Sequence, residues 1–347
     1  MRFLLYCKKN KKTKKRLSMN CLFVKIPMKP KIFILSCLLL LATTVLPAHA
    51  EPLPIFVSIP PQKWLVEQIG RDLVNIQVLL DKGQEPHTYQ PSPEKITALF
   101  RSRLYFTIGM PFERQIARKI TSHKESHKDT KNTGLQLIDI TPSIHKIALE
   151  VHGHDGHNDH HDHQEDEKKY ENEELPQEHA DPHVWLDPRN GEKMAAAIAD
   201  ALAAADPKHT ALYQQNFEKL KKRLTRLHQE LEQQLAPFQG ASFFVFHPAF
   251  GYFAHAYGLH QQAVEVEGKA PSPKQLFALV KQAKRDKIKV LFVQPQFDKK
   301  NALTVAHAIK GKLVELNPLQ ENIEQNLRQM ANAIQAAFES ERPKEIE

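Results

Sequence analysis

The sequence predicts an α/β fold in which two similar lobes, each built on a parallel sheet, are joined by one long helix. Short apolar runs alternate with helical patterns along the chain, which favours parallel sheets covered by helices on both faces. Residues 91–99 (PSPEKITAL) resemble residues 271–279 (PSPKQLFAL), as expected if the two halves are built alike. A third observation is one long amphipathic stretch between the two sets of apolar runs.

The expected strands form two sets of four. The first set is 54–59, 74–80, 104–108 and 135–138, and the second is 242–246, 262–266, 289–293 and 312–316. A proline just after a capping residue marks the start of a helix, because proline is favoured in the first helical turn. This pattern occurs at Ser92-Pro93, Asp187-Pro188, Asp206-Pro207 and Ser272-Pro273.

The amphipathic stretch, residues 209–235, predicts a helix roughly 40 Å long at 1.5 Å per residue. Its apolar positions recur mostly three and four residues apart and form one stripe. They are Leu212, Phe217, Leu220, Leu224, Leu227, Leu231 and Leu235. The pattern fits both a surface helix packed on one sheet and a rigid connector that runs along both lobes.

The first fifty residues are typical of an export signal. An apolar run at 32–46 follows two lysines and ends in the small-residue pattern Ala48-His49-Ala50. A membrane-spanning helix needs about 20 apolar residues, so this run is too short for one. We expect cleavage after Ala50 and a periplasmic location, with Met28 as an alternative start of translation.

Net charge and cysteine content change when this leader is removed. The chain has 48 Lys and Arg residues against 40 Asp and Glu, a formal charge of +8. Eleven of the basic residues and none of the acidic ones lie in residues 1–50, so residues 51–347 have a net charge of −3. Cys7, Cys21 and Cys37 also lie in the leader, and Cys37 sits inside the apolar run, which argues against a lipid anchor. The processed chain therefore lacks both cysteine chemistry and the basic charge that nucleic-acid binding needs.

A histidine-rich and acidic segment, about 145–178, contains almost no residue that could be buried, which predicts a disordered loop. Its histidines are His152, His154, His157, His160, His161 and His163. The segment could be an inert solvated spacer. It could also attract transition metals weakly, as histidine-rich tracts do.

Three other histidines are candidate metal ligands. His87 and His247 each follow an expected strand, and ligands of parallel α/β sheets bind beyond the carboxyl ends of the strands. His183 directly precedes the helix expected at Pro188. Taken singly, each is more often an ordinary loop residue than a ligand, and their spacing is not that of a compact zinc motif.

The local sequences around these histidines are more specific. They are Pro86-His87-Thr88-Tyr89, residues 181–188 (DPHVWLDP) and residues 247–253 (HPAFGYF), with similar turns at residues 294–297 (QPQF) and 317–319 (NPL). Together, and in this order, they resemble the ZnuA-like family of zinc-type solute-binding proteins of ABC importers. The resemblance covers residues 51 to about 338.

This resemblance implies a metal site between the two lobes, with His87, His183 and His247 as the ligands. Manganese-type relatives are expected to carry a carboxylate where this chain has His247, and three imidazoles suit Zn²⁺ better than Mn²⁺. Many relatives have an aspartate where this chain has Asn317. The fourth ligand is therefore open between water, Glu85 and Asn317.

The expected function is high-affinity periplasmic binding of Zn²⁺ and its delivery to the permease and ATPase subunits of an ABC importer, by a chain that is monomeric and not an enzyme. The alternatives are an extracytoplasmic zinc-dependent hydrolase, a manganese- or iron-type receptor of the same fold, and an adhesin or metal-buffering surface protein. Expected domain boundaries are 51–206 for the first lobe, 207–238 for the connecting helix and 239–347 for the second lobe. Zinc affinity is expected to fall as pH drops through the histidine range near ~6.5.

Overall fold

The computed structural model describes residues 51–126, 134–149, 180–265, 272–286, 288–297 and 299–341. The predicted leader (1–50) and the six histidines of the predicted loop lie outside these residues. Within them, no helix combines the length and the apolar character needed to cross a membrane.

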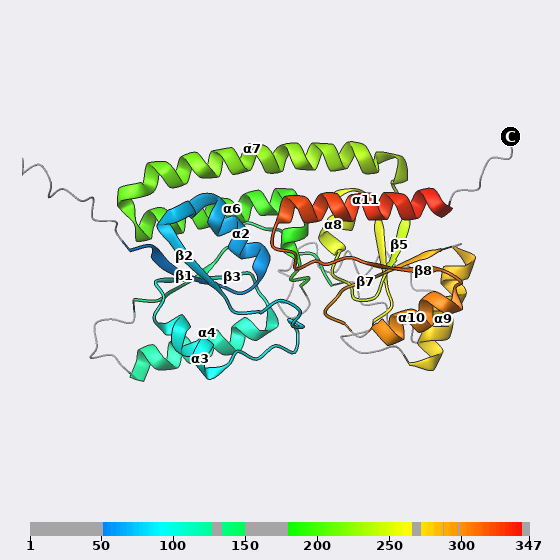
Figure 1. Cartoon of the computed structure of the whole chain (residues 1–347), viewed down its shortest axis with the longest axis horizontal. Coiled ribbons are helices and arrows are strands. Elements are labelled where there is room, and N and C mark those ends of the chain that lie inside the picture. The colour runs from blue at the N-terminus through cyan, green and yellow to red at the C-terminus, as the bar shows by residue number, and fades with distance from the viewer. Residues whose placement is uncertain are drawn as a thin grey trace, which may run out of the picture. The chain divides into compact units, whose positions relative to one another are not determined.

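Two four-stranded parallel sheets form the framework, which confirms the predicted fold class (Figure 1). The first sheet has the order β2-β1-β3-β4 and the second has the order β6-β5-β7-β8, so the two lobes share one topology. The strands are β1 (Leu53–Val57), β2 (Val74–Val78), β3 (Leu104–Thr107), β4 (Gln136–Asp139), β5 (Ser242–Val245), β6 (His260–Ala263), β7 (Val290–Val293) and β8 (Lys312–Glu315).

All eight expected strands are present, but β6 begins two residues earlier than predicted. It is an edge strand paired in register with β5, from Ser242 opposite His260 to Val245 opposite Ala263. Three of its four residues are polar, although Gln261 is buried, and the sequence prediction followed the apolar residues that come later. The backbone continues past β6 beside β5, and the Glu265 N–H donates to the Phe246 carbonyl. This continuation brings Glu265 next to His247.

Helices cover both faces of the first sheet, with α2 and α6 on one side and α3 and α4 on the other (Figure 1). Ser92, Asp187 and Ser272 cap helices as the sequence predicts, each accepting a backbone N–H. Pro207 instead opens a short 3₁₀ turn before α7. The helices are α2 (Pro60–Gly70), α3 (Pro93–Phe100), α4 (Pro111–Ser126), α6 (Pro188–Ala205), α7 (Thr210–Leu235), α8 (Gly251–Ala256), α9 (Pro273–Arg285), α10 (Lys299–Ala308) and α11 (Ile323–Glu341).

The long helix α7 connects the two lobes, as the connector interpretation predicts, and it passes along both sheets (Figure 1). Its buried stripe packs against α2, α6 and α11. Asn216 Nδ2 donates to the Ile69 carbonyl at the end of α2, and Gln234 bonds to Asn332 and Gln335 of α11. Leu212 does not belong to the stripe, because its side chain is 40% exposed.

One hydrophobic core runs through both lobes. It joins residues of the first sheet, such as Phe106, to residues of the second, such as Phe243 and Phe292, through the buried face of α7. A smaller second cluster lies under α9 and α10. The two lobes therefore share buried apolar residues on the inner face of α7.

Candidate metal centre

The three candidate histidines come from three separate elements and meet in one place. His87 lies in the loop between β2 and α3, His183 precedes a 3₁₀ turn at the start of α6, and His247 directly follows β5. One nitrogen of each ring lies within 4.8 Å of the others, an arrangement that could hold a metal ion. His183 and His247 are buried, at 2% and 5% exposure, and His87 is half-buried.

The ring geometry fits a tetrahedral ion. The Nε2 atoms of His87 and His247 are 3.1 Å apart. Two nitrogens bound at about 2.0–2.1 Å to one tetrahedral zinc are separated by roughly 3.3–3.4 Å. Ring centroids lie 4.8 Å apart for His87 and His247, 5.4 Å for His183 and His247, and 6.0 Å for His87 and His183.

Two buried carboxylates orient the buried imidazoles. His183 Nδ1 lies 2.7 Å from Asp181 Oδ1, and His247 Nδ1 lies 2.7 Å from Glu265 Oε2. Each carboxylate accepts the Nδ1 proton, which leaves the Nε2 lone pair free to face the centre. Such carboxylate–histidine pairs fix the tautomer and raise the basicity of a metal ligand.

Burial lowers the pKa of two of the three imidazoles, those of His87 and His183. Burial, together with the neighbouring His247 and His183 rings, lowers the pKa of His87 to about 4. Burial also lowers the pKa of His183 well below its usual range, with a further contribution from His247. Neutral imidazole is the form that binds zinc, so at neutral pH these two ligands need not lose a proton first.

Side chains of the second lobe hold His247 in place. The Gln294 side chain accepts the His247 N–H and donates to the His247 carbonyl, at 3.2 and 2.8 Å. The Phe297 ring stacks on the imidazole, with ring centroids 4.8 Å apart. On the other side, Trp185 Nε1 donates to the Pro318 carbonyl at 2.8 Å, which ties the His183 turn to the second lobe.

A cavity of about 10 Å³ lies between the three rings, closed by Gln296, Phe297, Pro318 and Leu319. A single water-sized sphere requires about this volume. The cavity can therefore accept one small ion but not an organic ligand.

The two side chains considered for a fourth ligand are engaged in turns. The Glu85 carboxylate accepts the His87 N–H at 2.7 Å and both the N–H and the hydroxyl of Thr88 at 2.6 Å. Asn317 Oδ1 accepts from Gln296 Nε2 at 2.8 Å and from the Leu319 N–H at 3.1 Å. Both side chains shape the loops around the cavity.

Sequence reasoning missed Glu265 and Gln294. Each lies just beyond the carboxyl end of a strand next to β5, and this position is the signal that could have found them. Because β6 was predicted to begin two residues too late, Glu265 fell inside the expected strand 262–266 and was not considered as a site residue. Asp187, the other carboxylate close to His183 in the sequence, caps α6 and pairs with Arg189 at 2.8 Å.

Comparison with known proteins gives the family of the chain. Residues 55–338 match the family described as zinc-uptake complex component A, periplasmic (ZnuA). The chain belongs to the ZnuA family. The high-affinity zinc uptake system protein ZnuA of Paracoccus denitrificans strain Pd 1222 is 34% identical over 242 residues, which cover 67% of this chain and 72% of that protein.

Solved ZnuA structures share the fold. A crystal structure of ZnuA matches with a TM-score of 0.71 and 34% identity, covering 82% of this chain and 99% of the other. A ZnuA deletion mutant with zinc bound matches with a TM-score of 0.68 and 34% identity, covering 82% and 98%. The ZnuA family consists of metal-binding solute receptors and not of enzymes.

In this ZnuA-family chain, Glu265→Gln is expected to weaken zinc binding by about 10–100-fold, the usual effect of losing such a partner. The amide keeps the shape of the side chain but removes the charge that supports His247. Competition titration of Zn²⁺ against a chelator measures the change. An unchanged zinc affinity would show that Glu265 does not support the ligand.

Gly251 packs against Asp181, the carboxylate that orients His183. A Cβ at this position would lie 2.6 Å from Asp181 Oδ2 and 3.2 Å from Gln261 Nε2. Gly251→Ala is therefore expected to displace Asp181, to weaken zinc binding and to cost about 1–3 kcal/mol of folding free energy, as overpacking does. Chemical denaturation and zinc titration measure the two effects.

Gly191→Ala is the matched control for Gly251→Ala. Gly191 lies inside α6, and a Cβ there meets only Leu224, at 3.5 Å or more. This substitution is expected to leave zinc binding unchanged and folding stability equal or slightly higher. If both alanine variants behaved alike, close packing on Asp181 would not be the cause.

Proposed function

We propose that the chain is a high-affinity periplasmic receptor that binds Zn²⁺ through His87, His183 and His247 and delivers it to an ABC importer. The observation that carries the proposal is the set of three imidazoles around an ion-sized cavity, two of them paired with buried carboxylates, in a member of the ZnuA family. The permease and ATPase subunits of the importer are its proposed partners, and the receptor acts as a monomer.

Zinc is the preferred cargo because all three side-chain ligands are nitrogens. Mn²⁺ favours carboxylate, carbonyl and water oxygens. With Glu85 and Asn317 engaged in turns, water completes the tetrahedron. The zinc-containing structure of a ZnuA deletion mutant at 34% identity supports this assignment.

A receptor fits the site better than a zinc hydrolase does. A hydrolase needs a free base beside metal-bound water. Among the described residues, the carboxylates of Asp181 and Glu265 accept histidine Nδ1 protons, and that of Glu85 is used in its own turn. No catalytic activity is expected of the zinc-loaded protein.

Export through a leader cleaved after Ala50 would place the receptor in the periplasm. The proposed domain boundaries remain 51–206, 207–238 and 239–347. Of the loop proposed for about 145–178, residues 145–149 are described, and the Ile147 carbonyl accepts the Asp181 N–H at 2.9 Å. The first five residues of that segment thus belong to the packed structure next to His183.

Metal analysis of the purified protein, followed by competition between Zn²⁺ and Mn²⁺, tests the proposed function. We expect one tightly bound zinc per chain and a preference for zinc over manganese. A deletion strain should stop growing at chelator concentrations that the parent strain tolerates. A preference for manganese, or growth unaffected by the deletion, would contradict the proposal.

The histidine-rich segment is proposed to gather zinc weakly near the tight site. Deleting residues 152–163 is expected to slow uptake when zinc is scarce but to leave one tight site per chain. Uptake of ⁶⁵Zn at limiting zinc, together with the stoichiometry of the purified variant, measures both outcomes. Loss of the tight site itself would refute this role.

A further inference from the structure

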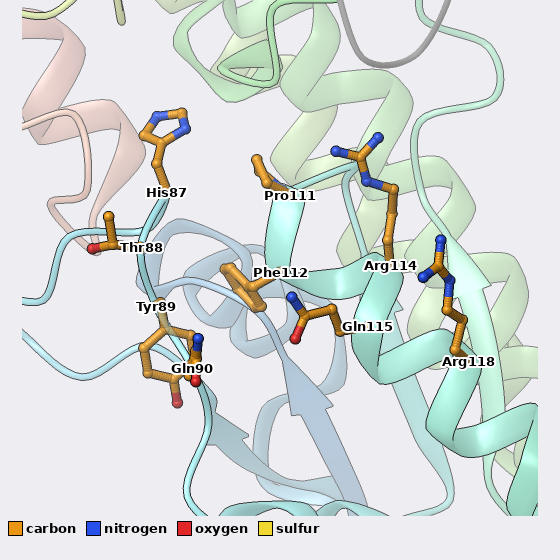
Figure 2. A pocket seen from close by; sticks show the side chains of 9 residues that line it. All are labelled: His87, Thr88, Tyr89, Gln90, Pro111, Phe112, Arg114, Gln115 and Arg118. Atoms are coloured by element: carbon orange, nitrogen blue, oxygen red, sulfur yellow. The ribbon is translucent and has the colours of Figure 1, made fainter. Parts of the chain in front are cut away.

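A second cavity, much larger than the space between the imidazoles, opens beside His87 (Figure 2). Its volume is about 580 Å³, within the range of about 300–1,000 Å³ that is typical of small-molecule sites. His87 forms part of its wall, so a molecule in this cavity would touch one of the proposed zinc ligands.

The wall opposite His87 carries two positive charges. Arg114 and Arg118 extend from successive turns of α4, with Phe112 and Gln115 between them and His87 (Figure 2). Neither arginine has an ion-pair partner among the described residues, and none of the residues that line the cavity is acidic. Like charges four residues apart on a helix repel each other, and a bound anion would relieve this repulsion.

The floor of the cavity is rigid and aromatic. Phe112 is only 4% exposed and packs edge-on against Tyr89, with ring centroids 5.0 Å apart. The Tyr89 hydroxyl donates a hydrogen bond to the Leu79 carbonyl at 2.5 Å. Thr88, Gln90 and Gln115 add polar groups around this floor. The cavity thus suits a small molecule that has both anionic groups and a hydrocarbon skeleton.

These two positive charges, which have no ion-pair partner in the part of the chain that the structure describes, would repel a bare Zn²⁺ that approached His87 from this side. They would attract zinc that arrives within an anionic complex, because a charged cleft concentrates ligands of the opposite sign. Guanidinium groups bind carboxylates through paired, charge-assisted hydrogen bonds.

We propose that the cavity between His87 and the arginines of α4 is a docking site for anionic zinc–polycarboxylate complexes, which hand their metal to the histidines. This inference rests on the proposed zinc-receptor function and specifies the form in which zinc is taken up. Arg114 and Arg118 hold the carboxylates, and His87 Nε2 replaces one carboxylate oxygen on the zinc. His183 and His247 displace the others as the ion moves inward, and the free polycarboxylate leaves through the cavity.

Stopped-flow measurement of zinc transfer tests the proposal, with Trp185 as the reporter, since its ring centroid lies 5.3 Å from that of His183. The donors are zinc citrate and zinc in a non-coordinating buffer. In the double variant Arg114→Gln/Arg118→Gln, transfer from zinc citrate is expected to slow by about tenfold or more, a typical size for loss of electrostatic steering. Transfer from uncomplexed zinc should be unchanged or faster.

Lys119→Gln is the matched control, because it removes one positive charge from an exposed position on α4 that does not line the cavity. It should leave both transfer rates unchanged. Equilibrium zinc affinity should be the same in all these variants, which separates a failure of this proposal from a failure of the zinc site. Equal slowing with both donors, or no slowing with zinc citrate, would overturn the docking site.

Discussion

Replacing His183 with alanine is expected to abolish tight zinc binding. His183 is fully enclosed, its Nδ1 is held by Asp181, and its Nε2 is one of three nitrogens that face the ion-sized cavity. Zinc affinity should fall by more than the roughly 10–100-fold that is typical when only a residue hydrogen-bonded to a metal ligand is removed. Chelator competition measures it, and His87→Ala and His247→Ala should give losses of the same kind.

The matched control is His260→Ala, because His260 is an exposed histidine at the start of β6. It should bind zinc as the wild type does. Since His183→Ala leaves the Asp181 carboxylate without its imidazole partner, the thermal stability of each zinc-free variant should also be measured. His87 is only half-buried, so His87→Ala separates loss of a ligand from loss of the fold. Tight zinc binding that survived in all three alanine variants would refute the assigned site.

The three candidate ligands could be named from the sequence because the short sequences around them, in this order, resemble those of the ZnuA-like family, and their positions near strand and helix ends agree with that interpretation. His87 and His247 stand beyond the carboxyl ends of β2 and β5, where parallel sheets place ligands, and the capping pattern at Pro188 placed His183 before a helix. Each of these signals depends only on residues that are close to the histidine in the sequence.

The supporting contacts could not be predicted in the same way, because they depend on which elements lie side by side. Glu265 reaches His247 only because β6 pairs with β5 in one particular register. The contact between His87 and His247 spans 160 residues and exists only when both lobes pack on α7 and share one core. No periodicity or spacing in the sequence encodes such pairings.

The pH dependence of zinc binding is expected to differ from that of ordinary histidines. A simple histidine site would lose zinc as pH falls through about 6.5. Here burial and the neighbouring rings lower the pKa of His87 to about 4, and burial lowers the pKa of His183 as well. An imidazole with a lowered pKa stays neutral as the pH falls, until the pH approaches that pKa. Protons should therefore compete for these two ligands only below about pH 5, where zinc affinity should fall steeply.

Asp181 adds a second loss of zinc affinity with falling pH, and this loss begins at a higher pH than the loss due to the histidines. Burial raises the pKa of Asp181 to about 7, so in the zinc-free protein this carboxyl gains a proton as pH falls through 7. Zinc on His183 favours the ionised carboxylate, so binding expels that proton and the dissociation constant rises by up to about tenfold per pH unit below 7. Zinc titrations from pH 8 to pH 4 should resolve both steps.

Asp181→Asn separates the two steps. The amide oxygen can still accept from His183 but no longer titrates, so affinity should be lower at pH 8 and the step that begins near pH 7 should be absent. The steep loss near pH 4 should remain, because it belongs to the imidazoles. A single transition near pH 6.5 in the wild-type protein would show that the rings are not held neutral by burial. An Asp181→Asn profile parallel to that of the wild type would show that the carboxyl is already ionised before zinc arrives.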